Sequence, residues 1–407
     1  MSLKKIKILQ ITPIKYPGSP RVLKEGRTFI EAGFDSAIIA PLIDSQSEFE
    51  ELDGIKIYRP KGLKNRSMLD RLLLTTLFYS PAWSQALKEV IREYQPDVLH
   101  VHDIWLGRSV LWSKGNEKII FDLHENIPAA VVEYQKMFNW RQQIFFSVFQ
   151  SAKRMLNYER HLLEKSDLIF TVVQEAQRRV LEDHPNLDDG KVFNIMNLES
   201  NAFLSSSRKA QPAFGKDHFS ILYIGGFGPH RGVDTLIKSM TLVKKIDKSI
   251  KIQLVGAKPS YYLTQLKLLI ERLGVQKEVE ITSWVDSDQV LANILQADLC
   301  CVPHNSNPHT DNTIPHKLFQ YMIAKRPILV SSSLPLQRII GDSKAGLAFR
   351  AEDADDCAEK ILLMARDKNK LKDYAQNGYN YVTKGGHNWE NESAPSLVSA
   401  YQGLFKK

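Results

Sequence analysis

The sequence predicts an α/β protein with two doubly wound domains, each built on a parallel β-sheet. A length of 407 residues exceeds what one hydrophobic core usually organises, so two domains of about 200 residues are expected. Short apolar, β-branched segments also alternate with longer segments of helical periodicity, and this alternation starts again near residue 219. Alternating strands and helices form parallel sheets covered by helices, and two such domains leave a cleft between them.

The first domain is expected to span residues 1–200, followed by a linker at 201–217 that is rich in serine and basic residues. Its strands are predicted at 6–12, 37–40, 55–58, 97–103, 119–125, 168–173 and 192–197. Its helices are predicted at about 21–32, 129–138, 141–165 and 174–183.

The second domain is expected to span residues 218–387, with a last helix at 388–407. Its strands are predicted at 219–224, 250–255, 279–285, 299–303, 328–332 and 346–349. Its helices are predicted from 233, at 260–273, 288–295, from 315, at 353–366 and at 369–377. Pro315 suits the first turn of a helix, because its ring fixes φ and its missing N–H is not needed there.

The composition is that of a soluble globular protein, with 43% hydrophobic and 25% charged residues. The three cysteines, Cys300, Cys301 and Cys357, cannot form a disulfide framework, and we expect them to be buried and reduced. The apolar N-terminal stretch stops at Pro13, too early for a signal peptide, and no apolar run reaches about 18 residues. These features predict a cytoplasmic location.

The net charge of +8 is unevenly distributed along the chain. Residues 1–200 carry a net charge of +1, whereas the remainder carries +7. A basic second half suits an anionic ligand such as a nucleoside diphosphate. Nucleic acid is not expected, because the lysines are dispersed over helix surfaces instead of clustering with aromatic residues.

Residues 61–83 combine basic with apolar and aromatic residues, among them Lys61, Lys64, Arg66 and Arg71 and Leu69, Leu72, Leu73, Leu74, Leu77, Phe78 and Tyr79. Such a basic amphipathic segment can lie on an anionic membrane surface. A helix that packs on the core and keeps its charges in solvent gives the same pattern, and it is the favoured interpretation.

Two predicted strands end in polar residues. His102 and Asp103 end one strand, and His124 and Glu125 end the next. Since ligands bind beyond the carboxyl ends of parallel strands, these four side chains should meet in one cleft. The loop after the first strand has no G-x-G-x-x-G sequence, which argues against a nicotinamide-dependent enzyme.

Two segments of the second domain predict an anion site. In the loop at 225–232, Gly225, Gly226 and Gly228 let the backbone approach a ligand, and Arg231 can pair with phosphate oxygens. The helix expected to open at Pro315 would present free backbone N–H groups, with His316 and Lys317 beside them.

These residues together resemble the family 4 glycosyltransferases, retaining enzymes of the GT-B fold. The likeness covers nearly the whole chain and rests on six motifs in the family's order. They lie at 21–34, 97–103, 121–125, 223–237, 297–327 and 389–401. The resemblance implies two Rossmann-like domains, the first binding an acceptor and the second a nucleotide-sugar, with the terminal helix crossing back to the first domain.

The resemblance also implies roles for individual residues. His124 would contact the transferred sugar, while Arg231 and Lys317 would stabilise the leaving diphosphate, so that neither a metal nor a separate cofactor is expected. Other donor-side residues would be Gly225, Gly226, Trp284, Val285, Asn312, Ile314, Pro315, His316 and Gln320. Acceptor-side residues would be Gly18, Arg21, His102, Asp103 and Glu125.

The sequence departs from the family pattern at three places. Gly226 stands where many members carry an arginine, and Arg231 replaces the usual lysine. Asn312 and Gln320 replace the two glutamates of the E-x7-E motif, the second of which normally binds the ribose hydroxyls. An amide offers that contact no negative charge.

The function expected is transfer of a sugar from a UDP- or GDP-linked donor to a glycan or lipid-linked acceptor in surface polysaccharide biosynthesis. This would take place in the cytoplasm, with peripheral contact at the inner membrane face left open. The alternative is a catalytically impaired GT-B protein that binds partners or ligands, which the two amides motivate. A GT-B epimerase fits less well, because no acidic pair for proton abstraction stands out.

Overall fold

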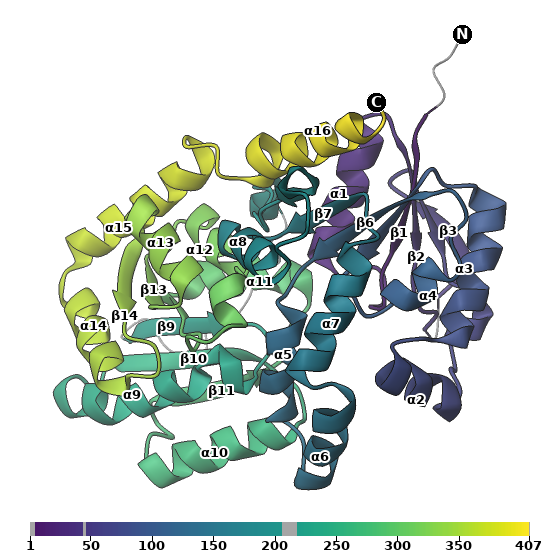
Figure 1. Cartoon of the computed structure of the whole chain (residues 1–407). Helices are drawn as coiled ribbons and strands as arrows, with labels where there is room; N and C mark the ends of the chain where they lie inside the picture. Colours follow the sequence, from purple (N-terminus) through teal and green to yellow (C-terminus); the bar gives the residue numbers. More distant parts are fainter. Residues whose placement is uncertain (1–4, 44–45, 206–217, 407) are drawn as a thin grey trace. The chain divides into compact units, whose positions relative to one another are not determined.

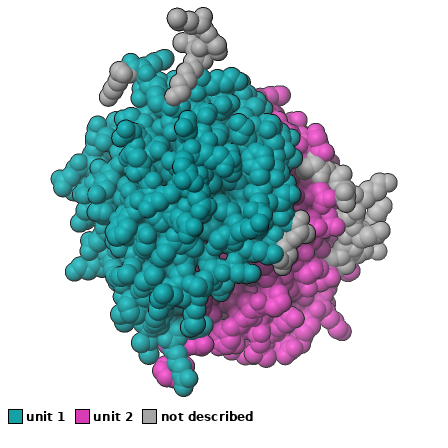
Figure 2. All heavy atoms as spheres, turned by 90° about the vertical axis from the view of Figure 1, so that its right-hand side faces the viewer, with its two compact units in different colours: residues 1–132, 141–196, 393–407 teal, residues 133–140, 197–392 magenta. Residues whose placement is uncertain are grey.

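The computed structural model describes residues 5–43, 46–205 and 218–406, and both halves have the predicted α/β character (Figure 1). The chain forms two compact units, coloured separately in Figure 2. Unit 1 contains residues 1–132, 141–196 and 393–407, and unit 2 contains residues 133–140 and 197–392. The chain therefore passes from one unit to the other four times.

Unit 1 is built on an eight-stranded sheet with the order β3-β4-β2-β1-β5-β6-β7-β8. Its strands are β1 (Lys7–Ile11), β2 (Asp35–Ile39), β3 (Phe49–Leu52), β4 (Ile55–Tyr58), β5 (Val98–His102), β6 (Lys118–Leu123), β7 (Leu168–Thr171) and β8 (Val192–Asn194). All neighbouring pairs are parallel except β3 and β4.

Unit 2 is built on a parallel six-stranded sheet with the order β11-β10-β9-β12-β13-β14. Its strands are β9 (Phe219–Ile224), β10 (Ile250–Ala257), β11 (Val279–Ser283), β12 (Leu299–Val302), β13 (Ile328–Ser331) and β14 (Gly346–Phe349). Strands β12 and β13 are buried at every position, as expected for the middle of a sheet covered on both faces.

Helices follow most strands. Those before residue 197 are α1 (Pro20–Glu31), α2 (Met68–Leu77), α3 (Pro81–Tyr94), α4 (Gly107–Leu111), α5 (Ile127–Gln135), α6 (Trp140–Phe149), α7 (Ala152–Leu163) and α8 (Gln174–Asp183). Those after it are α9 (Val233–Ile246), α10 (Tyr261–Leu273), α11 (Ser287–Gln296), α12 (Lys317–Ile323), α13 (Leu334–Ser343), α14 (Ala354–Arg366), α15 (Lys368–Thr383) and α16 (Ala394–Leu404).

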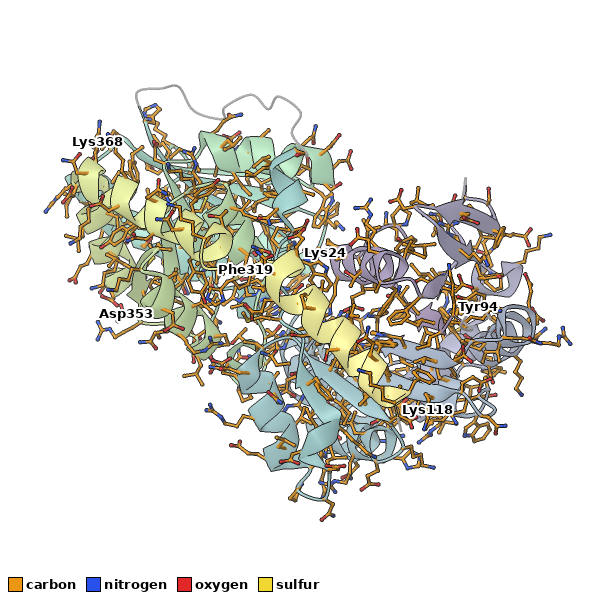
Figure 3. The ribbon with its side chains drawn as sticks, turned by 90° about the horizontal axis from the view of Figure 1, so that it is seen from above. Lys24, Tyr94, Lys118, Phe319, Asp353 and Lys368 are labelled. Carbon is orange, nitrogen blue, oxygen red and sulfur yellow. The ribbon has the colours of Figure 1, made fainter. Side chains whose placement is uncertain are left out.

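Side-chain caps explain where several helices begin. The carboxylate of Asp353 accepts the N–H groups of Asp355 and Asp356 and so starts α14. Asp367 does the same for Lys370 and starts α15 one residue later, at Lys368. Figure 3 labels Asp353 and Lys368 at these two helix starts.

The elements depart from the prediction in several places, and helices α3, α4 and α13 were not predicted. The helix expected at 141–165 is broken, because Arg154 donates to the carbonyl of Phe149 and ends α6 before α7 begins. Strand β3 was not predicted, since its sequence is acidic and lacks alternation. The helix expected to open at Pro315 begins two residues later, at Lys317, with His316 in the capping position.

The expected domain limits also differ from the observed units. Residues 133–140 pack with unit 2, where the ring of Tyr134 lies edge-on to those of His230 and His309. The chain leaves unit 1 after residue 196, not 200, and returns at 393, after a π-helical turn at Trp389–Ser393. Of the linker expected at 201–217, residues 201–205 form a 3-10 turn and the remainder lies outside the described residues.

Candidate functional site

Each sheet has one central strand at which the strand order reverses: the next strands of the chain are added first on one side of it and later on the other side. In unit 1 this is β1, between β2 and β5, and in unit 2 it is β9, between β10 and β12. In open α/β sheets, ligands bind beyond the carboxyl ends of the strands at such a switch point. His124 lies at the first of these positions, and Arg231 and Lys317 lie at the second.

In unit 1 the switch point carries a buried cluster of charged and polar side chains, which we call the histidine–carboxylate cluster. Its members are Arg21, Glu25, His100, His102, Asp122 and His124. Strand register assembles it, since Gln10 pairs with His100 and His102 pairs with Asp122 across neighbouring strands.

Asp122 lies at the centre of this cluster. Arg21 forms two hydrogen bonds with its carboxylate, Nε to Oδ2 and Nη2 to Oδ1, each 2.8 Å long. Burial alone would raise the pKa of Asp122, but the charges of Arg21 and His124 outweigh it and hold that pKa well below its usual value. Asp122 is therefore an anion held by two cationic partners.

His124 is bound to this anion. Its Nε2 lies 2.7 Å from Oδ2 of Asp122 and 3.1 Å from Nδ1 of His102. Burial lowers the pKa of His124, but the carboxylates of Asp122 and Asp103 reverse the effect and raise it to about 9. His124 is thus an imidazolium at neutral pH, and its side chain keeps 20% of its surface exposed.

His102, in contrast, is neutral. Its Nε2 lies 3.1 Å from Oε1 of Gln10, which can only accept, so Nε2 carries the proton and Nδ1 accepts from His124. Burial, with the neighbouring histidines, lowers the pKa of His102 to about 3. A neutral His102 orients the charged ring of His124.

Asp103 adopts a left-handed conformation with φ of 59°, which is uncommon for a residue other than glycine. It accepts the backbone N–H of His124 at 2.8 Å. Burial and the charge of Glu125 raise the pKa of Asp103 to about 6, against the effect of His124. Of the four side chains predicted to meet, His102, Asp103 and His124 are thus brought together, and Glu125 acts on Asp103 through its charge.

Gly18 lies in the turn before α1, where a Cβ would stand 2.7 Å from the carbonyl oxygen of Lys15. A side chain would not fit this turn. The turn leads into Pro20, the first residue of α1, and so fixes the start of the helix that carries Arg21.

Glu25 and His100 extend the cluster towards α16. Oε2 of Glu25 lies 3.3 Å from Nε2 of His100, whose Nδ1 lies 2.6 Å from the hydroxyl of Tyr401. All three side chains are fully buried. Burial and the charge of Asp122 raise the pKa of Glu25 to about 7, so this carboxyl exchanges its proton near neutral pH.

Four members of the cluster could offer ligand atoms to a metal ion. These atoms, from Glu25, His100, His102 and Asp122, all lie within 4.8 Å of one another. However, Nε of Arg21 lies 2.9 Å from Glu25 and 2.8 Å from Asp122, so a divalent cation would meet a guanidinium. The donor set fits an ion-pair network better than a metal site.

In unit 2 the switch point carries two basic side chains. Lys317 is buried, and its Nζ lies 4.0 Å from the ring centroid of Tyr223. Gly225, with φ of 138°, leaves the space that Nζ occupies, since a Cβ there would overlap it. Burial and the charge of Arg231 lower the pKa of Lys317 well below its usual value.

Arg231 ends the short turn Pro229–Arg231 that follows the glycine loop. Its Nη1 lies 3.5 Å from Nε2 of His304, which follows β12. Gly232, with φ of 63°, lies so close to Pro303 that a Cβ would overlap that carbonyl oxygen. The loops after β9 and β12 therefore pack directly on each other. Among the described residues, neither Arg231 nor Lys317 forms an ion pair with a carboxylate.

Helix α12 corrects the expectation that the backbone N–H groups after Pro315 are free to bind an anion. With only seven residues, it bonds the N–H groups of Leu318 and Phe319 back to Pro315 and His316, so these two N–H groups are not left free for an anion. Ile314, before this turn, is buried.

Gln320, one of the two amides that replace glutamates, has a carboxylate beside it. Its Nε2 donates to Oε2 of Glu199 at 2.8 Å, and both side chains are buried. The other amide, Asn312, donates to the carbonyl of Pro308 at 2.8 Å within its own loop. A negative charge thus stands next to Gln320, supplied from another part of the chain.

The remaining donor-side predictions lie at different places. A Cβ added to Gly226 would meet no described atom within 4 Å, so this glycine leaves room beside the loop. Trp284 and Val285 follow the edge strand β11, two strands away from β9, and Nζ of Lys258 lies 3.9 Å above the Trp284 ring.

Several site residues were not predicted, although the sequence contains a signal for some of them. Asp122 and His124 are two residues apart, as are His100 and His102, and such pairs point to the same face of a strand. Glu25, Tyr401 and Glu199 gave no such signal, because tertiary contacts alone bring them to the clusters.

Family models match both parts of the chain. The model for glycosyltransferase family 4 matches residues 21–195, and the model for glycosyl transferases group 1 matches residues 206–381. The chain belongs to the family 4 glycosyltransferases. The predicted family and the predicted GT-B fold are confirmed. No significant match is found among curated protein sequences.

Solved structures similar to this glycosyltransferase share its fold at low sequence identity. Sucrose-phosphate synthase from Thermosynechococcus elongatus has a TM-score of 0.78 and 18% identity, covering 98% of this chain and 99% of that one. A glycosyltransferase from Rickettsia africae has a TM-score of 0.69 and 15% identity, covering both chains fully. Anabaena Alr3699/HepE in complex with UDP and glucose has a TM-score of 0.68 and 12% identity, covering 99% of this chain and 100% of that one.

Proposed function

We propose that this glycosyltransferase moves a sugar from a UDP- or GDP-linked donor to a glycan or lipid-linked acceptor, with retention and without a metal. The observation that carries the proposal is the pair of basic side chains at the switch point of unit 2, Arg231 and Lys317. Neither forms an ion pair with a described carboxylate, so both are available to an anion. The UDP in the Anabaena structure of the same fold supports a nucleoside diphosphate as that anion.

The chemistry follows from where charge develops. When the bond between the sugar and the diphosphate breaks, negative charge grows on the diphosphate oxygen, and preorganised cations stabilise it most in a site with little water. Arg231 can form paired hydrogen bonds with phosphate oxygens, while Lys317 supplies a compact donor.

His124 would bind the sugar through a hydrogen bond. As an imidazolium bonded to Asp122, it can donate hydrogen bonds, but neither ring nitrogen has a free lone pair with which to accept a proton as a base. Transfer with retention on the face that the diphosphate leaves requires no protein nucleophile. We therefore assign His124 to binding and charge stabilisation.

Thermal unfolding with UDP, GDP and ADP tests the donor proposal. A ligand that binds only the folded state adds RT ln(1 + [L]/Kd), about 2.7 kcal/mol at a hundredfold excess over Kd. We expect one of the three to raise the melting temperature, and Arg231→Gln to remove most of that shift. A lack of any shift at millimolar ligand would contradict donor binding and favour a protein without turnover.

Transfer itself is tested with His124→Ala once the donor is known. We expect the variant to keep the thermal shift with the nucleoside diphosphate but to lose transfer to the acceptor. Unchanged transfer would show that the assignment of His124 is wrong.

We also propose peripheral contact with an anionic membrane, the setting of a lipid-linked acceptor and of surface polysaccharide biosynthesis at the inner face. In α2 several apolar side chains are exposed: Met68 is 89% exposed and Leu69 64%, whereas Leu74 packs partly buried on the core and the only fully buried side chain is that of Asp70. Leu63 and Phe78 of the segment at 61–83 lie in the core, as the core-facing interpretation expects, but Met68 and Leu69 of α2 do not. The reason is that Asp70 faces inwards, where it accepts from Ser80 and from the N–H of Ala82.

A second exposed helix lies beside α2. Helix α6 has no buried residue, and it exposes Ile144 and Val148. Arg154 donates both to the carbonyl of Thr76 in α2 and to that of Phe149 at the end of α6, which holds the two helix ends together. Both helices lie towards the lower edge of Figure 1. No described helix is both long and apolar enough to cross a membrane.

Vesicle sedimentation tests this surface. We expect binding to vesicles that contain anionic phospholipid, weaker binding to purely zwitterionic vesicles, and loss of binding in the double variant Leu69→Ser, Leu72→Ser. Leu363→Ser, an exposed leucine of α14 in unit 2, is the matched control. Equal binding by the double variant and the control would contradict the proposal.

A further inference from the structure

We propose that His230 and His304 belong to the diphosphate site of unit 2, and that the site takes up protons there when the donor binds. The inference rests on the proposed function, and it adds two histidines to which neither the sequence motifs nor the comparisons give a role. Together with Arg231 and Lys317, they would form a donor site whose positive charge increases when the ligand binds.

His230 provides the first observation. It lies in the turn between the glycine loop and Arg231, and only 4% of its surface is exposed. Neither of its ring nitrogens has a hydrogen-bond partner among the described residues. A buried polar group without a partner costs free energy, so an imidazole held in this way is expected to have a partner in some functional state.

His304 provides the second observation. Its Nε2 lies 3.5 Å from Nη1 of Arg231, a group that can only donate, so Nε2 is the acceptor and the proton lies on Nδ1. Nδ1 is buried and has no hydrogen-bond partner among the described residues. His304 thus holds an unused N–H donor beside the guanidinium that is expected to bind phosphate.

The groups that act most strongly on the charge of the two histidines are basic or neutral, although one of them, Lys136, is paired with Glu133. They are Arg231, Lys317, Lys136 and His309, together with the ring of Tyr134, 5.6 Å from that of His230. Burial and Arg231 lower the pKa of His230 to about 2, and the same two causes hold that of His304 well below its usual value. Both rings are therefore neutral in the free protein, although they lie among cations.

A bound diphosphate would oppose the effect of the surrounding positive charges on the two imidazoles. Its negative charges favour the protonated form of each nearby imidazole, so the pKa of both rings rises in the complex. Between the pKa of the free protein and that of the complex, binding takes up a proton, and affinity falls as pH rises through the pKa of the complex. Burial and the charge of Arg231 also lower the pKa of Lys317, so Lys317 contributes in the same direction.

Isothermal titration calorimetry measures the uptake directly. The probe is UDP or GDP, whichever gives the larger thermal shift, titrated at fixed pH in buffers of different ionisation enthalpy. We expect His230→Gln and His304→Gln each to reduce the number of protons taken up, and to flatten the pH dependence of Kd by up to tenfold per pH unit. The ligand's own phosphate also ionises, near pH 6, but this contribution is the same for every variant and cancels in the comparison.

His161→Gln, an exposed histidine on α7 in unit 1, is the matched control and should titrate like the wild type. Nitrogen chemical shifts of labelled histidine in the wild-type protein, with and without ligand, give a second readout that does not depend on a variant folding. If the shifts show both rings neutral in the complex, or if both variants take up as many protons as the control, the inference is overturned. If neither nucleoside diphosphate binds at any pH, the proposed function fails instead.

Discussion

Asp122 accepts hydrogen bonds from Arg21 and His124 in unit 1, and both Asp122 and Arg21 are almost fully shielded from water. Removing one partner of a buried ion pair leaves the other charge uncompensated, which costs about 3–5 kcal/mol. We expect Asp122→Asn to destabilise the protein by that order and to lower the pKa of His124. Chemical unfolding and a histidine NMR titration measure the two effects.

Asp53→Asn is the control for this change. Asp53 also pairs with an arginine, Arg27, at 2.7 Å, but both side chains are about half exposed. Exposed pairs contribute about 0–1 kcal/mol, so this variant should leave stability nearly unchanged. Equal losses in the two variants would show that the buried network has no special role.

His124 links stability to pH. Its pKa rises to about 9 in the folded protein, against about 6.5 in an unfolded chain. A raised pKa contributes stability that is fully present below the unfolded value and is lost as pH rises through the folded value. We expect the gap in melting temperature between wild type and His124→Gln to be largest at pH 6.5 and to narrow towards pH 10. A gap that stays constant with pH would mean that His124 is not charged.

Gln320→Glu restores the family's usual residue, yet we expect it to be harmful in this chain. The new carboxylate would lie about where the amide now stands, next to Glu199, and two buried carboxylates cannot both ionise at little cost. The double variant Glu199→Gln, Gln320→Glu exchanges the two groups and should recover most of the loss. The melting temperatures of the wild type, the two single variants and the double variant form a double-mutant cycle, which measures the coupling between the two residues. Gln320→Glu as stable as the wild type would contradict the proposed pairing.

At the scale of elements, the loops after β9 and β12 depend on Gly232. Its φ of 63° costs about 1–2 kcal/mol for any other residue, and a Cβ would also overlap Pro303. We expect Gly232→Ala to lower the melting temperature and to weaken nucleoside diphosphate binding, because Arg231 and His304 lie on these two loops. Gly341→Ala in α13, where a Cβ would meet no described atom within 4 Å, should be neutral or stabilising.

The order of strands and helices could be predicted because buried parallel strands read as apolar runs, as in β12 and β13. The ends of helices could not be predicted where tertiary contacts determine them. Arg154 divides a segment that has continuous helical periodicity, and the inward-facing Asp70 leaves Met68 and Leu69 of α2 exposed. Neither effect is visible in the periodicity of the segment itself.

The same distinction applies to the candidate site. His124, Arg231 and Lys317 follow strands or open a helix, so their positions could be derived from the sequence pattern. The pairing of Glu199 with Gln320 joins residues 121 positions apart, and that of His100 with Tyr401 joins residues 301 positions apart. No local pattern encodes such contacts.

At the scale of the whole molecule, the excess positive charge lies in the second half of the chain, which carries +7 of the net +8. Charges spread over a surface act at long range and are screened by salt. We therefore expect nucleoside diphosphate binding to weaken several-fold between about 50 and 500 mM salt. If the affinity does not change with salt, the electrostatic attraction of the ligand comes from the residues around Arg231 and not from the dispersed surface charge.

The four crossings between the units limit how this protein can be divided or recombined. A fragment cut at residue 200 would keep Phe29 and His100 but lose Tyr401, whose ring lies 4.8 Å from that of Phe29. It would also carry residues 133–140 without their packing partners. Exchange of donor modules between related enzymes, by recombination or by design, would therefore have to move residues 133–140 together with 197–392, and return the last fifteen residues to the recipient.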